Sequence, residues 1–375
     1  MGEWKMKQRI MILTSFITGA GHKSITEALT EQIAHYPGVE VETVEGFDLG
    51  GAANRKVGEM YGTVTRNAKP LWGLIWDMQS LAPGALNQVM AQRIERIFLE
   101  RVKAFQPDLL LSVHAMFNGS IINILEKEKL DIPMVTLLAD LVSIADLWID
   151  KRCTWTLCPS EESYNLLLGD LWQIPETRLK RCDFPIRERF YNPEAEKTDR
   201  VYKPGDDLQV LIMSGGEGSG NLKRTAELIL TNFKKSRITV IAGRNQKVQQ
   251  TLREELQPRF GKRIEIVGFV DNVQDYMRAA DIAVVRGSPN TLLEGVMCNT
   301  PLLVVGALPG QEAANPAYVL KNDLGAVCDG NKNIVQVMEQ LVAYGGAQLT
   351  AIRQAQRAFR KPQAAREIVD FLVNL

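Results

Sequence analysis

The sequence has few histidines, no cysteine pair and no long apolar run, and each shortage excludes a class of protein. Five cysteines are scattered along the chain without a Cys-x-x-Cys pair. This pattern argues against a disulfide framework or a zinc site and predicts reduced thiols in a cytosolic protein. No apolar run approaches the roughly 18 residues of a membrane-spanning helix. The 44 basic residues balance 44 acidic ones, so we expect no nucleic-acid partner.

What the chain does have is enough apolar sequence for a large core. Its 375 residues are 45% apolar, which predicts two domains or one large domain. The opening "MGEWKMKQRIMILTSFITGAG" has the basic start of a signal peptide, but its apolar part is short and leads into a glycine turn. We therefore expect a buried first strand in a cytoplasmic protein.

Short apolar runs alternate with longer amphipathic stretches over most of the sequence. Such runs are typical of strands buried on both faces of parallel sheets, with helices as connections. The predicted strands lie in RIMILTSF, VEVETVE, PDLLLSV, IPMVTLLA, WTLCPS, LQVLIMSG, RITVIAG, RIEIVGF, IAVVRG and PLLVVG. The predicted helices include 24–35, 86–105, 222–235, 246–257 and 290–298.

A polar segment with two prolines, residues 191–207, divides these strands into two sets of about five. We expect an N-terminal domain at 1–195, a C-terminal domain at 196–357 and a terminal helix at 358–375 that packs back on the N-terminal domain. The tail should be interrupted near Pro362. The predicted fold class is α/β, with two doubly wound parallel-sheet domains facing a cleft, where ligands bind beyond the carboxyl ends of the strands.

The turn "TGAGHKS" joins the first strand to a helix and places His22 at the helix start. Gly19 and Gly21 allow a tight turn with open amides, but Ser24 stands where a dinucleotide fingerprint needs its third glycine. Three interpretations remain: an anion site, a catalytic base or a simple connection. A helix N-terminus lowers the pKa of an imidazole, which suits a general base.

Three further residues at element ends have both chemical and structural interpretations. Asp140 ends the run PMVTLLAD and opens onto the cleft, where it either orients His22, acts as the base itself or caps a loop. His114 ends PDLLLSV on the same side and is either structural or part of the acceptor side. His35 lies at a helix end, where a surface role is expected.

The second half carries several loops suited to a diphosphate or a sugar. MSGGEGSGN offers Gly215, Gly216 and Ser219 as an amide nest or a flexible loop, and Arg244 in AGRN follows another strand. In RGSPNTLLEG, Arg286 precedes a helix and Glu294 lies in its first turns, as a ribose ligand or for dipole reasons. After PLLVVG, the polar residues Gln311, Glu312 and Asn315 either bind the hydroxyls of a sugar or simply form a turn and the start of a helix.

Residues 60–90 differ from the rest of the chain because large apolar side chains mix with basic ones. This stretch predicts either a face that enters a membrane interface or an interior helix. The residues concerned are Tyr61, Arg66, Lys69, Leu71, Trp72, Leu74, Ile75, Trp76 and Met78.

These pieces together resemble one family. The stretch ILTSFITGAGHKSITEAL is similar to the opening of processive diacylglycerol glucosyltransferases and plant-type monogalactosyldiacylglycerol synthases, relatives of the peptidoglycan N-acetylglucosaminyltransferase with the GT-B fold. PDLLLSVHAMF, LLADLVSIADLWIDKRCTWTLCPS and the long block VGFVDNVQDYMRAADIAVVRGSPNTLLEGVMCNTPLLVVGALPGQEAANPAYV resemble further motifs of that family. The resemblance covers most of residues 10–330.

The resemblance implies an inverting glycosyltransferase that moves a hexose from UDP-glucose or UDP-galactose to diacylglycerol or a related lipid. It implies GT-B architecture, a peripheral position on the membrane surface, and no cofactor or metal. His22 would be the base, with Asp140 as a second catalytic candidate and Gly21, His114, Arg66, Lys69, Trp72 and Trp76 on the acceptor or membrane side. The implied UDP-sugar residues are Gly215, Gly216, Ser219, Arg244, Gly268, Phe269, Val270, Arg286, Ser288, Pro289, Asn290, Thr291, Glu294, Gln311 and Glu312.

The chain departs from the family pattern mainly on the acceptor side. Ala139 stands where the family commonly has a threonine, Ala145 where it has a histidine, and the turn RGSPNT has Arg286 and Asn290 in place of lysine and glycine. These departures leave two alternatives to the implied function. One is a UDP-sugar enzyme with a soluble acceptor or a 2-epimerase, and the other is a UDP-sugar-binding protein without catalysis.

Overall fold

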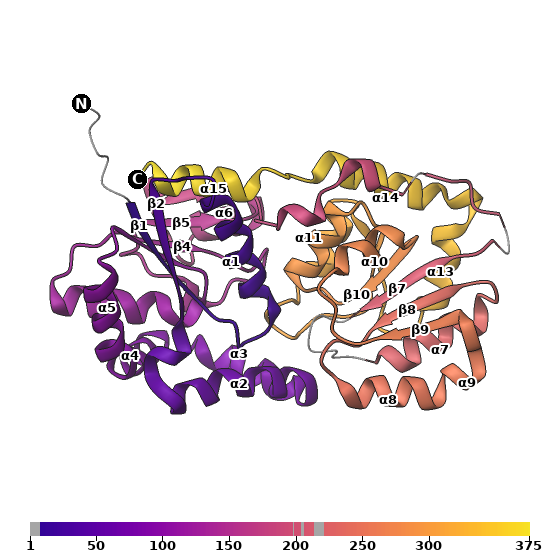
Figure 1. Cartoon of the computed structure of the whole chain (residues 1–375), viewed down its shortest axis with the longest axis horizontal. Helices are drawn as coiled ribbons and strands as arrows, with labels where there is room; N and C mark the ends of the chain where they lie inside the picture. Colours follow the sequence, from indigo (N-terminus) through magenta and orange to yellow (C-terminus); the bar gives the residue numbers. More distant parts are fainter. Residues whose placement is uncertain (1–7, 198, 204–205, 214–220) are drawn as a thin grey trace.

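The computed structural model describes residues 8–197, 199–203, 206–213 and 221–375. Within this part the side chains of 61–63, 65–67, 69–70 and 78–79 are not described. Two parallel six-stranded sheets form the centres of two halves that lie side by side, each covered by helices (Figure 1). The predicted α/β fold with two doubly wound domains is therefore confirmed.

The N-terminal sheet has the strand order β2-β1-β3-β4-β5-β6. Strand β1, the second in this order, pairs along its whole length with β2 on one side and over Ile10–Leu13 with β3 on the other. The last five residues of β1 are buried, as are all four of β3, because both faces of the sheet carry helices. The strand bounds are β1 Gln8–Thr14, β2 Val39–Glu45, β3 Leu109–Ser112, β4 Met134–Leu137, β5 Trp155–Cys158 and β6 Leu179–Arg181.

The C-terminal sheet has the order β12-β11-β10-β7-β8-β9. All its strands are parallel, but successive strands are added on one side of β7 up to β9 and on its other side from β10 onward. The N-terminal sheet changes side in the same way between β1 and β3, and ligands of open α/β sheets bind outside such points. The strand bounds are β7 Gln209–Met213, β8 Arg237–Ile241, β9 Ile264–Val267, β10 Ile282–Val285, β11 Leu302–Val304 and β12 Gly325–Val327.

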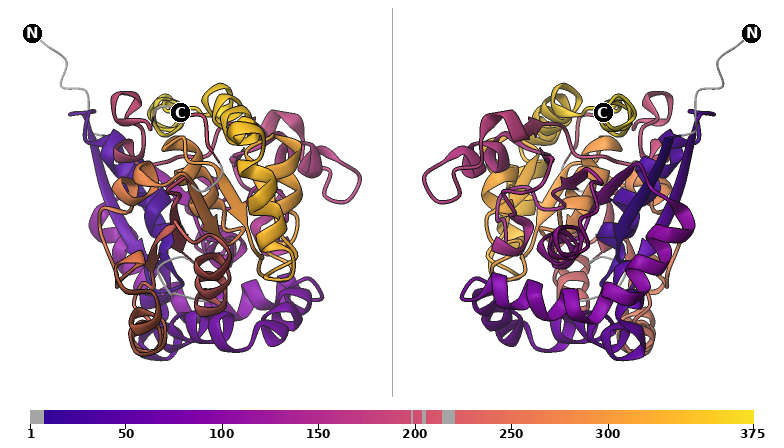
Figure 2. Two further views of the ribbon diagram at one scale, coloured as in Figure 1. Left: turned by 90° about the vertical axis from the view of Figure 1, so that its right-hand side faces the viewer. Right: turned by 90° about the vertical axis from the view of Figure 1, so that its left-hand side faces the viewer.

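Helices connect the strands and cover the sheets (Figure 2). Those of the N-terminal half are α1 Ala20–Ile33, α2 Gly51–Asn67, α3 Lys69–Gln79, α4 Pro83–Phe105, α5 Asn118–Glu128 and α6 Glu161–Leu168. The C-terminal half adds α7 Leu222–Asn232, α8 Gln246–Glu255, α9 Gln257–Phe260, α10 Val273–Ala279, α11 Pro289–Met297, α12 Asn315–Lys321, α13 Ile334–Val342, α14 Ala347–Phe359 and α15 Ala364–Val373.

All ten predicted strands form, but each sheet also has one strand that the sequence did not reveal. These are β6 and β12, three-residue strands with the sequences LKR and GAV, which are too short to stand out as apolar runs. Helix α1 also begins earlier than predicted. It starts at Ala20 because Gly19 takes a backbone φ of 112°, which favours glycine.

The C-terminal tail is helical and breaks between α14 and α15, as the proline near 362 predicted. Helix α15 returns to the N-terminal half and packs on α1 (Figure 1). There the side chain of Gln8 donates to the carbonyl of Leu372, and the hydroxyl of Tyr36 donates to Asp370. The last helix therefore connects the C-terminal half to the edge of the N-terminal sheet.

The polar segment 191–207 packs against the C-terminal half in its described part. Asp281, which is fully buried, accepts hydrogen bonds from the Tyr202 hydroxyl at 2.9 Å and the Gln209 amide at 2.8 Å. The ammonium of Lys197 pairs with the same carboxylate at 2.6 Å. A buried carboxylate needs such partners to offset its desolvation. The segment therefore leaves the N-terminal half and is fixed at once to the second sheet.

Candidate active site

A cleft with a volume of about 690 Å³ lies between the two halves, at the ends of strands from both sheets. Its N-terminal wall comes from the turn after β1 and the residues after β4, and its C-terminal wall from the segments after β8, β9, β10 and β11. The predicted site residues that line it are Gly21, His22, Asp140, Arg244, Phe269, Val270, Arg286, Ser288, Pro289, Asn290, Thr291, Glu294, Gln311 and Glu312.

His22 lies in the first turn of α1 and has a fixed tautomer. Its Nδ1 is 2.6 Å from the carbonyl oxygen of Val113, at the end of β3. Because a carbonyl only accepts, Nδ1 carries the proton and Nε2 keeps its lone pair. Burial lowers the pKa of His22 to about 4, and the bond to Val113 opposes this shift. The imidazole is therefore neutral near pH 7. The predicted direction is confirmed, although burial causes it rather than the helix dipole.

The ring of His114 packs against the ring of His22. The two ring centroids are 4.3 Å apart, and the Nδ1 of His114 accepts a hydrogen bond from the amide of Met116. Its Nε2 therefore carries the proton and faces the hydroxyl of Thr18 at 3.3 Å. Burial, and then the neighbouring His22, keep its pKa well below 6.5. His114 is outside the residues that line the cleft, so it contacts the predicted base rather than the cavity.

Asp140 connects the two walls. Its carboxylate accepts a hydrogen bond from the indole N–H of Trp148 at 2.8 Å and another from the side chain of Gln311, across the cleft, at 3.3 Å. Burial raises the pKa of Asp140 to about 7; both hydrogen bonds oppose this shift, and Glu312 adds to it. Neither bond reaches His22, so the imidazole is oriented by Val113 and not, as one interpretation of the sequence had it, by Asp140.

The C-terminal wall is built around the start of α11. Ser288 is its N-cap and Pro289 its first residue, and this first turn, whose peptide N–H groups have no partner within the helix, lines the cleft. Arg286 just before them is held by Glu312, with 3.0 Å between Nε and Oε2. The same Oε2 accepts from the amide of Leu308 at 2.8 Å. Glu312, which was expected to bind the donor sugar, thus also holds Arg286 beside the loop at Leu308.

Arg244 and Phe269 form a second part of this wall. The guanidinium carbon lies 4.1 Å from the centroid of the Phe269 ring, which is a cation–π contact. Phe269 is 46% exposed and lies among the residues that line the cleft. Gly268 lies behind it, beside the side chain of Gln249 and outside the cleft lining. The arrangement offers a flat surface beside a positive charge, as a nucleotide base and its phosphates require.

Glu294 is buried in the second turn of α11 and already has partners. Its Oε1 accepts from the hydroxyl of Ser24 at 2.9 Å and from the guanidinium of Arg187 at 2.8 Å. Burial raises the pKa of Glu294, while Arg187 and Ser24 oppose that shift. Both partners come from the N-terminal half of the chain. The carboxylate predicted to bind a ribose is therefore held by residues of the other wall.

Helix α3 brings part of the 60–90 stretch against the C-terminal wall. A Cβ built on Gly310 would be 2.2 Å from the indole of Trp76, and one on Gly73 would be 3.3 Å from Pro309. Trp76 thus packs on the loop that carries Gln311, whereas it was expected on the acceptor or membrane side. Leu71, on the same helix, is exposed. One face of the helix therefore packs on the loop and another is exposed, and the membrane interpretation of this stretch stays a prediction.

Some predicted site residues lie outside the described part of the chain. They are Gly215, Gly216 and Ser219 of the expected amide nest. Arg66 and Lys69 lie on α2 and α3, but their side chains are likewise outside the description. Trp72 is half-buried on α3. Within the residues that are described, no cluster of three His, Cys, Asp or Glu side chains is arranged to hold a metal ion.

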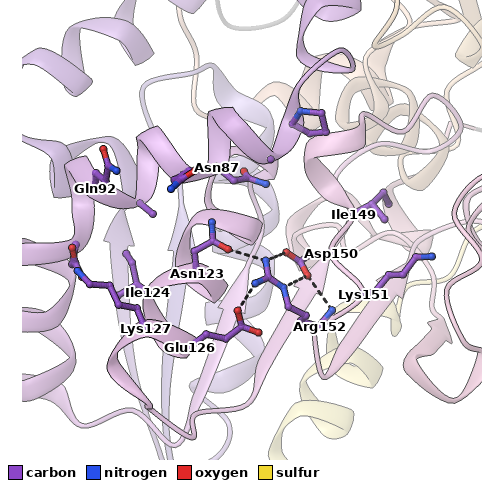
Figure 3. A pocket seen from close by; sticks show the side chains of 15 residues that line it. Asn87, Gln92, Asn123, Ile124, Glu126, Lys127, Ile149, Asp150, Lys151 and Arg152 are labelled. Carbon is purple, nitrogen blue, oxygen red and sulfur yellow. Dashed lines mark hydrogen bonds and ion pairs between the residues drawn. The ribbon is translucent and has the colours of Figure 1, made fainter.

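A second hollow, of about 990 Å³, lies in the N-terminal half between α4, α5 and the segment before β5. At its centre Arg152 binds Asp150 at 2.6 Å, Glu126 at 2.5 Å and Asn123 at 2.9 Å (Figure 3). None of the predicted site residues lines it, and the charges of its side chains already compensate one another. We therefore place the candidate active site in the cleft between the halves.

Sequence reasoning missed three side chains that the tertiary structure brings to the site. Ser24 was read only as a missing glycine, and Trp148 lay in a matched segment without an assigned role. Arg187 precedes the polar linker, and no motif marked it. The signal that could have found Ser24 is its position three residues after Gly21, since residues i and i+3 share one face of a helix.

Comparison with known families agrees with this geometry. Residues 22–178 match the family model described as monogalactosyldiacylglycerol (MGDG) synthase. Residues 209–366 match the model of the glycosyltransferase family 28 C-terminal domain. The first match contains His22 and Asp140, and the second contains the arginines and α11 of the opposite wall. The first match lies within the N-terminal half, and the second contains all six strands of the C-terminal sheet.

Similar proteins and structures point the same way. The chain is 25% identical to monogalactosyldiacylglycerol synthase 1, chloroplastic, of Arabidopsis thaliana over 383 residues, which covers 96% of this chain and 70% of the relative. It is 25% identical to the chloroplastic synthase of Spinacia oleracea over 388 residues, covering 98% and 72%.

Among solved structures, MurG of Acinetobacter baumannii matches with a TM-score of 0.64 and 14% identity, covering 98% of this chain and 100% of that one. The UDP-GlcNAc 2-epimerase of Neisseria meningitidis matches with a TM-score of 0.65 and 12% identity, with the same coverage. These likenesses show the shared GT-B fold. The chain therefore matches the monogalactosyldiacylglycerol synthase family in its N-terminal half and the glycosyltransferase family 28 C-terminal domain in its C-terminal half.

Proposed function

We propose that this protein transfers a hexose from a UDP-sugar to diacylglycerol or a related membrane lipid, with inversion at the anomeric carbon. The family supports the reaction type, since the similar plant proteins are named monogalactosyldiacylglycerol synthases. The observation that carries the mechanism is His22. It is a neutral imidazole whose tautomer is fixed by Val113, which leaves Nε2 unprotonated, and it lines the cleft opposite the helix N-terminus and arginines of the other wall.

The C-terminal wall would bind the donor. The uracil stacks beside Phe269, and the ribose hydroxyls donate to Glu294. The diphosphate lies against the start of α11, with Arg244 and Arg286 as positive charges nearby. Helix amides and fixed cations stabilise the charge that develops on UDP as it leaves. Gln311, in the loop after β11, contacts the hexose.

The N-terminal wall would activate the acceptor. The lipid hydroxyl attacks the anomeric carbon from the face opposite UDP, so one C–O bond forms while the bond to the β-phosphate oxygen breaks. The hydroxyl proton passes to Nε2 of His22, and the electron pair of the broken bond leaves with UDP. A positioned base typically contributes about 10²–10⁴-fold to the rate. No metal takes part in this scheme.

Asp140 would act as an anionic anchor between the walls. Its carboxylate accepts the side chain of Gln311, so it holds the residue that contacts the hexose. Protonation of Asp140 would remove its charge and give one of its oxygens a proton to donate, which weakens this arrangement. Because its pKa is about 7, this effect falls near neutral pH.

The exposed apolar face of α2, α3 and α4 would place the cleft at the membrane surface. Leu81 is 81% exposed and Leu74 is 56% exposed, on segments that adjoin the cleft loop at Gly310. Other large apolar side chains exposed on this face are Val57, Met60, Leu71, Ile75, Leu86 and Val89. Every helix in the described ranges is too short or too polar to span a bilayer. We propose peripheral binding at the cytoplasmic side, with these side chains inserted at the interface.

Incubation with labelled UDP-galactose or UDP-glucose and diacylglycerol liposomes tests the proposal. Formation of a labelled glycolipid with one donor is expected, and NMR of the product should show the anomeric configuration opposite to that of the donor. Retained configuration would overturn the inverting mechanism. Conversion of the UDP-sugar to its 2-epimer, transfer only to soluble alcohols, or UDP binding with no turnover on any acceptor would each overturn the proposed function.

A further inference from the structure

Helices α1 and α11 meet directly across the boundary between the two halves (Figure 1). A Cβ built on Gly21 would lie 2.9 Å from the side-chain nitrogen of Asn290, so the two helices approach closely at their first turns. One turn further along, the hydroxyl of Ser24 donates to Oε1 of Glu294 at 2.9 Å. The helix that carries His22 and the helix that carries Glu294 are therefore joined by two successive contacts.

Arg187 completes this junction. One guanidinium nitrogen donates to Oε1 of Glu294 at 2.8 Å, and the other donates to Glu27 of α1 at 2.8 Å. The side chain of Arg187 is only 14% exposed. Its planar fork reaches carboxylates on two different helices at once, which a lysine cannot do with the same geometry. The two acids thus share one buried counter-charge at the edge of the cleft.

The hydrogen bonds leave only part of the Glu294 carboxylate free for a ligand. Each carboxylate oxygen has two lone pairs, and both donors from the N-terminal half use Oε1. In the described part of the chain no hydrogen bond uses Oε2, and Glu294 lines the cleft. A ribose hydroxyl must therefore donate to Oε2, whose direction is set by the groups that hold Oε1.

We propose that Ser24 and Arg187 are positioning residues for the donor, which orient Glu294 so that its Oε2 accepts the ribose hydroxyls. The inference rests on the proposed function, because it requires that Glu294 meets the ribose of a UDP-sugar. It adds that ribose recognition is not a property of the C-terminal half alone. The acceptor-binding half supplies both side chains that hold the carboxylate.

The direct test compares binding of UDP with that of 2′-deoxy-UDP to the whole protein, by isothermal titration calorimetry. The wild type should prefer UDP by at least about tenfold, since a hydrogen bond to a charged group is lost with the hydroxyl. Ser24→Ala should reduce this preference several-fold, and Arg187→Met should reduce it further because the counter-charge is also lost. Arg187→Lys, which keeps the charge but not the fork, should recover only part of it.

Two controls separate orientation from folding. Ser120→Ala removes a buried helical serine of the same half whose hydroxyl donates to the backbone of Met116, and it should leave the preference unchanged. Affinity for inorganic diphosphate, which has no ribose, should be the same in wild type and Ser24→Ala. A Ser24→Ala variant that loses diphosphate binding in parallel would indicate general disruption and overturn the proposed role.

The outcomes distinguish this inference from the proposed function. If the wild type binds no UDP, both fail. If it binds UDP and makes glycolipid, but Ser24→Ala and Arg187→Met keep the wild-type preference for UDP over 2′-deoxy-UDP, the inference alone fails. Loss of the preference in both variants, with retention in Ser120→Ala, supports it.

Discussion

The two walls of the cleft use different chemistry. The N-terminal wall carries buried titratable groups, His22 and Asp140, whose pKa values burial moves to about 4 and about 7. The C-terminal wall carries a helix N-terminus, the arginines 244 and 286, and an exposed ring. One wall is suited to accept a proton and the other to bind an anion. Each task needs its own environment, since desolvation that tunes an acid or base would weaken an open phosphate site.

The largest effect on the transfer rate is expected from a substitution in the N-terminal wall. His22→Gln removes the lone pair of Nε2 while its amide can still reach the Val113 carbonyl, so transfer should fall by about 10²–10⁴-fold. UDP affinity, measured by calorimetry, should change little because the residue lies opposite the anion-binding wall. Turnover within about threefold of the wild type would remove His22 as the base.

A second prediction concerns Asp140, which touches both walls. The carboxylate form is needed to accept Gln311, so activity should fall as pH drops through about 7. In Asp140→Asn the rate at pH 8 should be lower than that of the wild type, and the fall in activity below about pH 7 should disappear. The measurement is kcat/KM between about pH 5 and pH 9. If His22 alone set the acid limb, the wild-type rate would instead stay flat down to about pH 5, since the pKa of His22 is about 4.

The third prediction tests the contact between α3 and the donor loop. Gly310 has a φ of +73° and no room for a Cβ beside Trp76. Gly310→Ala should destabilise the protein by more than the roughly 1–2 kcal/mol expected for a left-handed backbone alone and should reduce transfer. Denaturant unfolding gives the free-energy change.

Gly330→Ala is the matched control for this prediction, because φ is +56° there and a Cβ would meet open space. A double variant with Trp76→Ala should recover the excess cost of Gly310→Ala. Equal destabilisation by Gly310→Ala and Gly330→Ala would show that the Trp76 contact contributes nothing.

The smallest effect on the folded state is expected at the membrane face. Leu74→Glu should reduce co-sedimentation with liposomes several-fold, because an exposed apolar side chain is replaced by a charge. Its effect on unfolding should stay within about 0.5 kcal/mol. Leu320→Glu is the control, since Leu320 is 52% exposed on α12 of the other half. Equal loss of liposome binding in both variants would remove the special role of this face.

Much of the fold could be read from the sequence, and the reason is periodicity. Runs such as RIMILTSF are apolar at every position because both faces of the sheet are covered, and a four- to eight-residue run of this kind is recognisable without any partner. LKR and GAV carry no such pattern, since they become strands only by pairing with β5 and β11. Edge strands of this length are defined by their neighbours rather than by their own composition.

The candidate site was predictable to the extent that its residues follow strand ends. His22, Asp140, Arg244 and Arg286 each come directly after a strand or open a helix, and parallel sheets gather such positions at one edge. Ser24 and Arg187 were not predictable in this way. Their partner Glu294 lies 270 and 107 residues away in the sequence, and no local pattern records which helices meet.

By itself the sequence determined the elements, their alternation and the types of chemistry present, because these depend on local patterns and on residue identity. Only the tertiary structure decided which nitrogen of His22 is free, why its pKa is low and which groups hold Glu294. Those properties arise from burial and from single hydrogen bonds between distant segments, such as His22 with Val113 and Ser24 with Glu294. The free energy of a buried proton or carboxylate depends on its surroundings, and the fold alone provides those.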